Sequence, residues 1–144
     1  MNKNYEFADI GTFATLKNNS YVLPDSKKTI PGKMFLNDLL KLTGCEISFN
    51  AFTSGQFVPF DHKHIENEET FIFLSGHGEC EVDGEKIEVH EGSVVHIHPN
   101  AIRNLCNTSK DSILTFIVIQ TKKESMNSVE LTKDGIGVIE RTKW

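Results

Sequence analysis

Two histidines one residue apart, followed by a carboxylate, are the residues of this sequence best suited to chemistry. His62 and His64 are separated by one lysine, and Glu69 follows His64 after four residues. In an extended strand, residues i and i+2 point to the same face, so the two imidazoles would project together. A carboxylate from a neighbouring strand would complete a set of two nitrogens and one oxygen. That set suits Fe, Mn, Ni, Co or Zn and leaves coordination positions open for a substrate.

The elements that must position these side chains are short strands joined by glycine-bearing turns. Strand patterns cover residues 45–53, 70–74, 78–82, 86–90, 93–98, 101–106 and 113–121. Asp83-Gly84, between two alternating runs, predicts a two-residue hairpin. Residues 34–44 have a rough helical spacing that ends at Gly44, so we expect at most one short helix there. Many short strands with almost no helix predict an all-β sandwich or barrel.

The stretch from Gly55 to Gly76 resembles the first motif of the cupin superfamily. In that motif a glycine is followed by His-x-His, a glutamate and a second glycine, which here are Gly55, His62, His64, Glu69 and Gly76. The two later spacings match, and the interval from Gly55 to His62 is one residue longer than usual. His-x-His alone is a weak signal, but the glycine-bounded spacing is specific. The alternative is a solvated acidic turn with ordinary surface histidines.

Residues 92–107 resemble the second cupin motif, with three departures. His98 stands in the proline place and Asn100 in the glycine place. Asparagine is the next-best residue at a left-handed backbone position. Arg103 occupies the place of the third histidine ligand. Arginine stays protonated and has no lone pair for a metal, so the three-histidine, one-glutamate site of the family is incomplete here.

Arg103 has two alternative roles. It could pair with Glu69 inside the barrel and replace the metal, which would make the protein a metal-free ligand binder. It could instead lie at the pocket edge and bind a carboxylate of the substrate, with the metal on His62, His64 and Glu69. The metal-binding alternative is favoured, because His62, His64 and Glu69 all stand at their expected places in the first motif. His98, at the end of its strand, could turn into the pocket as a substitute ligand, but a surface or interface role is favoured.

The resemblance also separates inward from outward positions. It places residues 95, 97 and 103 on the inner face of the barrel and His96 on the outer face. His77 and His90 lie beside turns, and we expect both to be exposed. The run 45–53 alternates, and Glu46, Ser48 and Asn50 share one face of it. That face is directed either to solvent or into a polar pocket. Candidate substrate-binding residues are therefore Arg103, Asn50, Ser48, Glu46 and Phe71.

The resemblance implies an antiparallel jelly-roll barrel in a single domain, often dimeric. We expect an N-terminal edge segment at 1–41, the barrel at 42–121 and a tail at 122–144 whose Trp144 packs on the fold or a partner. Because a partner commonly covers the sheet edges of small barrels, a homodimer is expected.

Composition limits the classes of function. The chain has 144 residues, enough for one domain with a core, and its formal net charge is −5. This charge argues against nucleic-acid binding. No signal peptide or membrane span is visible. Cys45, Cys80 and Cys106 form no CxxC pair, which predicts reduced thiols in a cytoplasmic protein.

These observations lead to one favoured function and one alternative. The favoured function is a cupin that binds a divalent metal and a small, anionic molecule, acting as an oxygenase, isomerase or decarboxylase. The alternative is a metal-free binding or sensory module without turnover. Neither a catalytic base nor turnover itself can be assigned, because fold does not fix activity.

Overall fold

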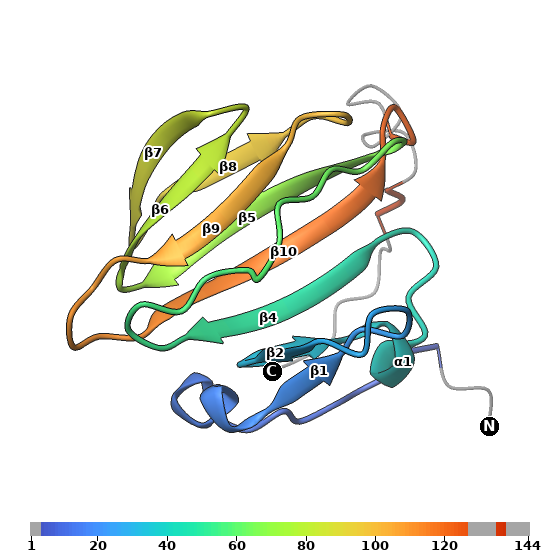
Figure 1. The fold of residues 1–144 in the computed structure, drawn as a ribbon. Helices are drawn as coiled ribbons and strands as arrows, with labels where there is room; N and C mark the ends of the chain where they lie inside the picture. The colour runs from blue at the N-terminus through green and yellow to red at the C-terminus, as the bar shows by residue number, and fades with distance from the viewer. Residues whose placement is uncertain (1–3, 127–134, 138–144) are drawn as a thin grey trace.

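The computed structural model describes residues 4–126 and 135–137 (Figure 1). The predicted packing of Trp144 lies outside these residues. The described part contains one 3₁₀-helix, η1 (Phe13–Asn18), and one short helix, α1 (Asn37–Leu40). Its strands are β1 (Ser20–Val22), β2 (Thr29–Pro31), β3 (Lys33–Phe35), β4 (Glu46–Phe52), β5 (Asn67–Ser75), β6 (His77–Val82), β7 (Glu85–His90), β8 (Val94–Ile97), β9 (Arg103–Asn107) and β10 (Leu114–Lys122).

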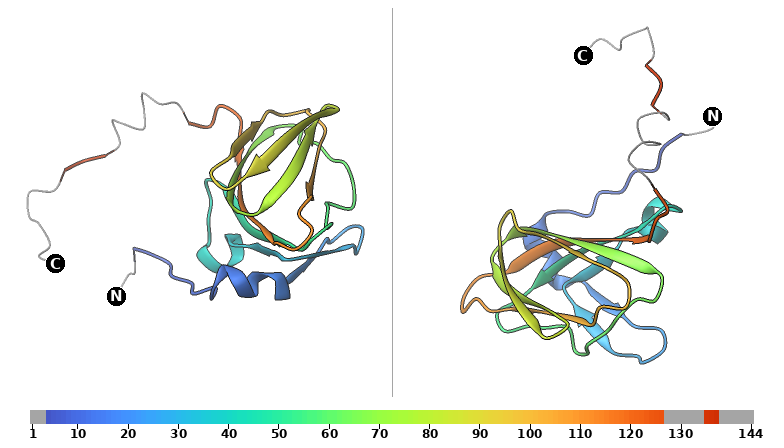
Figure 2. Two further views of the ribbon diagram at one scale, coloured as in Figure 1. Left: turned by 90° about the vertical axis from the view of Figure 1, so that its left-hand side faces the viewer. Right: turned by 90° about the horizontal axis from the view of Figure 1, so that it is seen from above.

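The strands form an antiparallel, all-β barrel, as expected from the sequence. A five-stranded sheet has the order β3-β4-β10-β5-β8, and a three-stranded sheet has the order β7-β6-β9. The two sheets curl over one another into a jelly roll, which the left view of Figure 2 shows end-on. The β1-β2 hairpin lies beside β4, outside these two sheets (Figure 1).

The hydrophobic core fills the part of the barrel where both sheets contribute large side chains. Phe71 and Phe73 on β5 and Phe116 on β10 lie within 6.4 Å of one another, ring centre to ring centre. Cys80 on β6 and Leu105 on β9 close the core from the facing sheet. Burial raises the pKa of the Cys80 thiol to about 11, so this cysteine is a packing residue and not a nucleophile at neutral pH.

Turns that join the strands agree with the predicted turn chemistry. Asp83 and Gly84 both have positive φ, 51° and 86°, and connect β6 directly to β7, as a type I′ hairpin requires. Asn100 adopts a φ of 70°, which explains why asparagine is tolerated where the motif has glycine. Gly76 has a φ of 84°, and a side chain there would overlap the Ile113 carbonyl.

The N-terminal segment differs from the expectation in one respect. Residues 34–35 belong to β3, which pairs with β4 at the edge of the large sheet. The helix that follows is only one turn, and it ends at Lys41 in the left-handed conformation and not at Gly44. The helical spacing of 34–44 was therefore misleading over its first residues, because the strand pairing of β3 overrides local propensity.

Candidate functional site

A cavity of about 340 Å³ opens inside the barrel, beside the aromatic core. The inner face of β4 supplies three of its polar lining residues, Glu46, Ser48 and Asn50. The pocket alternative for the 45–53 run is therefore confirmed over the solvent alternative. Phe71, the fourth residue expected here, forms part of the apolar wall.

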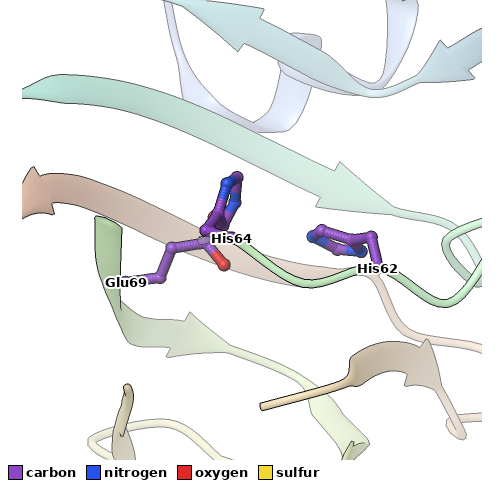
Figure 3. Close-up of side chains that lie close together, drawn as sticks. All are labelled: His62, His64 and Glu69. Atoms are coloured by element: carbon purple, nitrogen blue, oxygen red, sulfur yellow. The ribbon is translucent and has the colours of Figure 1, made fainter. Parts of the chain in front are cut away.

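His62 and His64 project from the irregular segment between β4 and β5 (Figure 3). The expectation that they lie in a regular strand is wrong, because this segment is tied to the barrel by a few backbone bonds only. His62 exchanges backbone hydrogen bonds with Arg103 on β9, and the His64 carbonyl accepts one from Asn100. The two rings still lie on the same side, with centres 5.7 Å apart, and both line the cavity.

Glu69 presents its two carboxylate oxygens to different partners. Oε1 lies 3.2 Å from Nε2 of His64, an approach that Figure 3 shows. Oε2 accepts a hydrogen bond from Nε of Arg103 at 2.9 Å. Nη2 of Arg103 lies 2.9 Å from the same oxygen, although its N–H groups are not aligned for a hydrogen bond. One oxygen therefore faces the histidines while the other is held by the arginine.

Arg103 is buried, with 1% of its surface exposed, and its Nη2 makes no hydrogen bond within the described residues. Besides the Glu69 contacts, its Nη1 donates to the Ala101 carbonyl at 2.8 Å. Arg103 also lines the cavity, so the binding of a substrate carboxylate by its guanidinium stays a prediction. The expected pair with Glu69 forms, but it leaves Oε1 for His64 and so does not by itself exclude a metal.

His62, His64 and Glu69 together could hold a metal ion. Each offers one ligand atom, and these atoms all lie within 4.8 Å of one another. Nδ1 of His62 is buried and has no hydrogen-bond partner among the described residues. A buried nitrogen of this kind is costly unless something binds it. Two imidazole nitrogens and one carboxylate oxygen fit a divalent transition metal.

The electrostatic environment keeps Glu69 and His62 in the forms that a metal needs. Burial alone would raise the pKa of Glu69, but the hydrogen bond with His64 and the charge of Arg103 outweigh it, so the pKa is lowered. Burial lowers the pKa of His62; the charge of Glu69 opposes this, while Arg103, His64 and Lys33 add to the lowering. Glu69 is therefore ionised and His62 neutral near pH 7.

The sequence analysis missed Lys33, which contributes a cation to this cavity. Its Nζ donates to Ser48 Oγ at 3.0 Å and to Asn50 Oδ1 at 3.1 Å, and it lies 4.5 Å from the Phe35 ring centre. Burial lowers the pKa of Lys33 to about 8, although Glu69 and Glu46 partly oppose this. Because β3 is only three residues long, its alternation gave no signal that residue 33 faces inward.

His98 is not among the residues that line the cavity. It lies instead with Glu68 and His96, in a separate group on the other side of β5. The alternative in which His98 replaces the missing third histidine is therefore wrong. His96, His77 and His90 are exposed, as expected.

An antiparallel jelly roll with a His-His-Glu cluster facing its cavity defines a class of barrel proteins, and the comparisons agree with it. Residues 51–120 match the family model for the cupin domain. A solved cupin protein from Bacteroides fragilis is 34% identical, with a TM-score of 0.75 over 95% of this chain and 99% of that chain. The chain belongs to the cupin superfamily.

Two further matches cover a smaller part of the chain. An uncharacterized protein of Aquifex aeolicus (strain VF5) is 38% identical over 69 residues, which are 48% of this chain and 55% of that protein. The chain thus spans about half the length of this curated relative. A predicted oxalate decarboxylase from Thermotoga maritima is 21% identical, with a TM-score of 0.50 over 53% of this chain and 64% of that chain. This second likeness shows the fold alone. In the described residues, no helix is long and apolar enough to cross a membrane.

Proposed function

We propose that this protein binds a divalent transition metal through His62, His64 and Glu69 and a small anionic molecule in the adjoining cavity. The observation that carries the proposal is the meeting of three ligand atoms within 4.8 Å at the cavity wall, one of the residues having a buried nitrogen without a partner. Arg103 positions Glu69 by binding its second oxygen. A bound metal would supply Lewis-acid polarisation of a ligand oxygen.

Lys33 supports an anionic ligand. An ammonium carries three N–H donors, and in the described residues Lys33 uses two of them, on Ser48 and Asn50. The third remains for a ligand in the cavity. Lys33 thus joins Arg103 as a candidate anion-binding residue of the cavity, and Ser48 and Asn50 hold its ammonium group in place.

The substrates that fit best are small carboxylates and keto acids. Such a molecule would place an anionic group on Lys33 and an oxygen toward the His-His-Glu cluster, with its carbon skeleton against Phe71 and Phe116. The class of reaction stays as expected from the sequence: oxygenase, isomerase or decarboxylase.

Metal analysis of tag-free protein tests the first half of the proposal. Wild type should carry near-stoichiometric Fe, Mn, Ni, Co or Zn, or take it up after dialysis, and H62A/H64A should lose this metal. A matched control is H77A/H90A, which removes two exposed histidines from β6 and β7. Equal metal content in wild type and H62A/H64A would overturn the metal assignment.

Ligand binding tests the second half. A thermal-shift screen of small carboxylates and keto acids should give a ligand whose dissociation constant is then measured for wild type and Lys33→Met. Loss of one hydrogen bond to a charged group, about 1.5–3 kcal/mol, predicts affinity weakened about 10- to 150-fold. Lys110→Met, at an exposed loop position, should bind as wild type does. Unchanged affinity in Lys33→Met would remove the lysine from the site.

A metal-free ligand-binding module is the second candidate. It is favoured by the Arg103–Glu69 pair, which already neutralises the buried carboxylate. In that case wild type would take up no metal in the inner site but would still bind carboxylates through Lys33. The two experiments above therefore separate the candidates.

The assembly and location of the protein remain predictions. Strands β3 and β8 form the two edges of the large sheet, and unpaired strand edges are commonly covered by another chain. We propose a homodimer, which light scattering coupled to size-exclusion chromatography would detect as twice the chain mass. A cytoplasmic location is likewise proposed from the cysteine usage alone.

A further inference from the structure

The outer face of β5 carries a second group of potential metal ligands. Glu68 and Glu69 are neighbours in β5, so their side chains point to opposite faces of the sheet. Glu69 faces the cavity, whereas Glu68 joins His96 and His98 on the outside. Glu68, His96 and His98 each offer one ligand atom, and these atoms all lie within 4.8 Å of one another. We call these three residues the outer cluster.

Strand pairing brings the outer cluster together. In the antiparallel register, Glu69 pairs with Ile97 and Thr70 with His96. Continuing this register places His98 opposite Glu68. Ile97 is buried, with 2% of its surface exposed, so the residues on either side of it, His96 and His98, are directed outward. The pairing of β5 with β8 therefore places the three side chains of the outer cluster on one face of the sheet, whatever their exact conformations.

His96 has the surroundings of a metal-binding histidine. Its Nδ1 lies 3.0 Å from Thr70 Oγ1. If Nδ1 donates to this hydroxyl, the lone pair of Nε2 is free, which is the usual arrangement for a metal-bound imidazole. Nε2 lies 3.6 Å from Glu68 Oε2, too far for a hydrogen bond. Two ligands at about 2.0–2.1 Å from a tetrahedral Zn²⁺ are about 3.3–3.4 Å apart.

The third ligand and the access route are also present. The rings of His96 and His98 have centres 5.0 Å apart and meet at 88°. The side chains of His96 and Glu68 are 42% and 27% exposed. An ion could therefore reach this cluster directly from solution, without entering the barrel.

We propose that Glu68, His96 and His98 form a second divalent-metal site, of the Zn²⁺ class, on the outer surface of the barrel. Two imidazoles and one carboxylate leave a fourth position for water or an exogenous ligand. The site links the edge strand β8, and the residue that follows it, to the neighbouring strand β5. Because the linked residues are close together only in the folded chain, metal binding there stabilises the fold. The proposal is independent of the inner cluster.

Zn²⁺ titration of tag-free protein against a chromophoric chelator tests this site. The variants are H96A/H98A for the outer cluster, H62A/H64A for the inner cluster, and the matched control H77A/H90A. With both sites functional, wild type and the control bind two Zn²⁺ per chain and each site variant binds one. If the inner site takes no metal, wild type and H62A/H64A bind one Zn²⁺ and H96A/H98A binds none. The two proposals can thus fail separately.

A second variant guards against a folding defect in H96A/H98A. Glu68→Gln keeps the size of the side chain and should weaken the outer site at least about tenfold, the lower bound for losing even an indirect partner of a metal ligand. The Zn²⁺-dependent rise in melting temperature contributed by this site should shrink in the same variant. Zn²⁺ stoichiometry and affinity equal to wild type in both H96A/H98A and Glu68→Gln would overturn the proposal.

Discussion

Replacing Arg103 by methionine should strongly destabilise the barrel. Arg103 and Glu69 are 1% and 6% exposed, and two nitrogens of the arginine lie 2.9 Å from one carboxylate oxygen. Methionine fills much of the space without a charge and adapts to irregular gaps. The variant leaves Glu69 buried with His64 as its remaining side-chain partner, so an ionised carboxylate loses its main counter-charge.

The expected magnitude follows from this burial. Removing one partner of a buried ion pair costs about 3–5 kcal/mol. At about 0.05–0.15 kcal/mol per residue, a chain of 144 residues has a total stability of roughly 7–20 kcal/mol. With a urea dependence of about 2 kcal/mol per molar, the unfolding midpoint should fall by about 1.5–2.5 M.

Urea unfolding followed by far-ultraviolet circular dichroism measures this shift in metal-free protein. Lys122→Met is the control, because it removes the exposed pair with Glu66, whose closest atoms are 3.4 Å apart, and should leave the midpoint unchanged. Adding Glu69→Gln to Arg103→Met should recover part of the loss, since the buried carboxylate that lost its arginine partner is then uncharged. A midpoint shift of less than about 0.5 M in Arg103→Met would refute the reasoning.

Three further outcomes are expected. Ligand affinity, measured by calorimetry, should fall as the pH rises through about 8, where Lys33 loses its charge, and this fall should be absent in Lys33→Met. Asn107→Ala should cost about 2–3 kcal/mol in urea unfolding, because the buried Asn107 amide donates two hydrogen bonds to backbone carbonyls at 2.8 Å; a loss below about 1 kcal/mol would contradict this. Gly76→Ala should lower the melting temperature clearly more than Gly84→Ala, because both positions have positive φ but only the first would overlap backbone; equal shifts would contradict the overlap argument.

Features fixed by local chemistry could be predicted from the sequence. Asp83-Gly84 defined a hairpin, because only a few residue pairs adopt positive φ twice in succession. The strict alternation along β4 identified Glu46, Ser48 and Asn50 as one face, and the motif spacing brought His62, His64 and Glu69 together. These signals depend on the residues themselves and their neighbours in sequence.

Features that depend on long-range pairing could not be predicted. The three residues of β3 are too short for a periodic signal, so Lys33 was not recognised as a cavity residue. The engagement of Arg103 with Glu69 and the Ala101 carbonyl depends on the exact meeting of β9 with β5. Gly44 was expected to end the helix, whereas β3 pairing shortens the helix and Lys41 takes the left-handed position.

The two halves of the cavity come from different parts of the chain, which has an evolutionary consequence. The match to the cupin family spans residues 51–120 and includes the His-His-Glu cluster and Arg103. Lys33 and the two side chains that hold it, Ser48 and Asn50, all precede that region. If Lys33 binds the anion and His62, His64 and Glu69 bind the metal as proposed, substitutions before residue 51 would change which anion is accepted and leave the metal ligands intact. On this proposal, relatives that share the barrel pattern would differ in ligand through this N-terminal part alone.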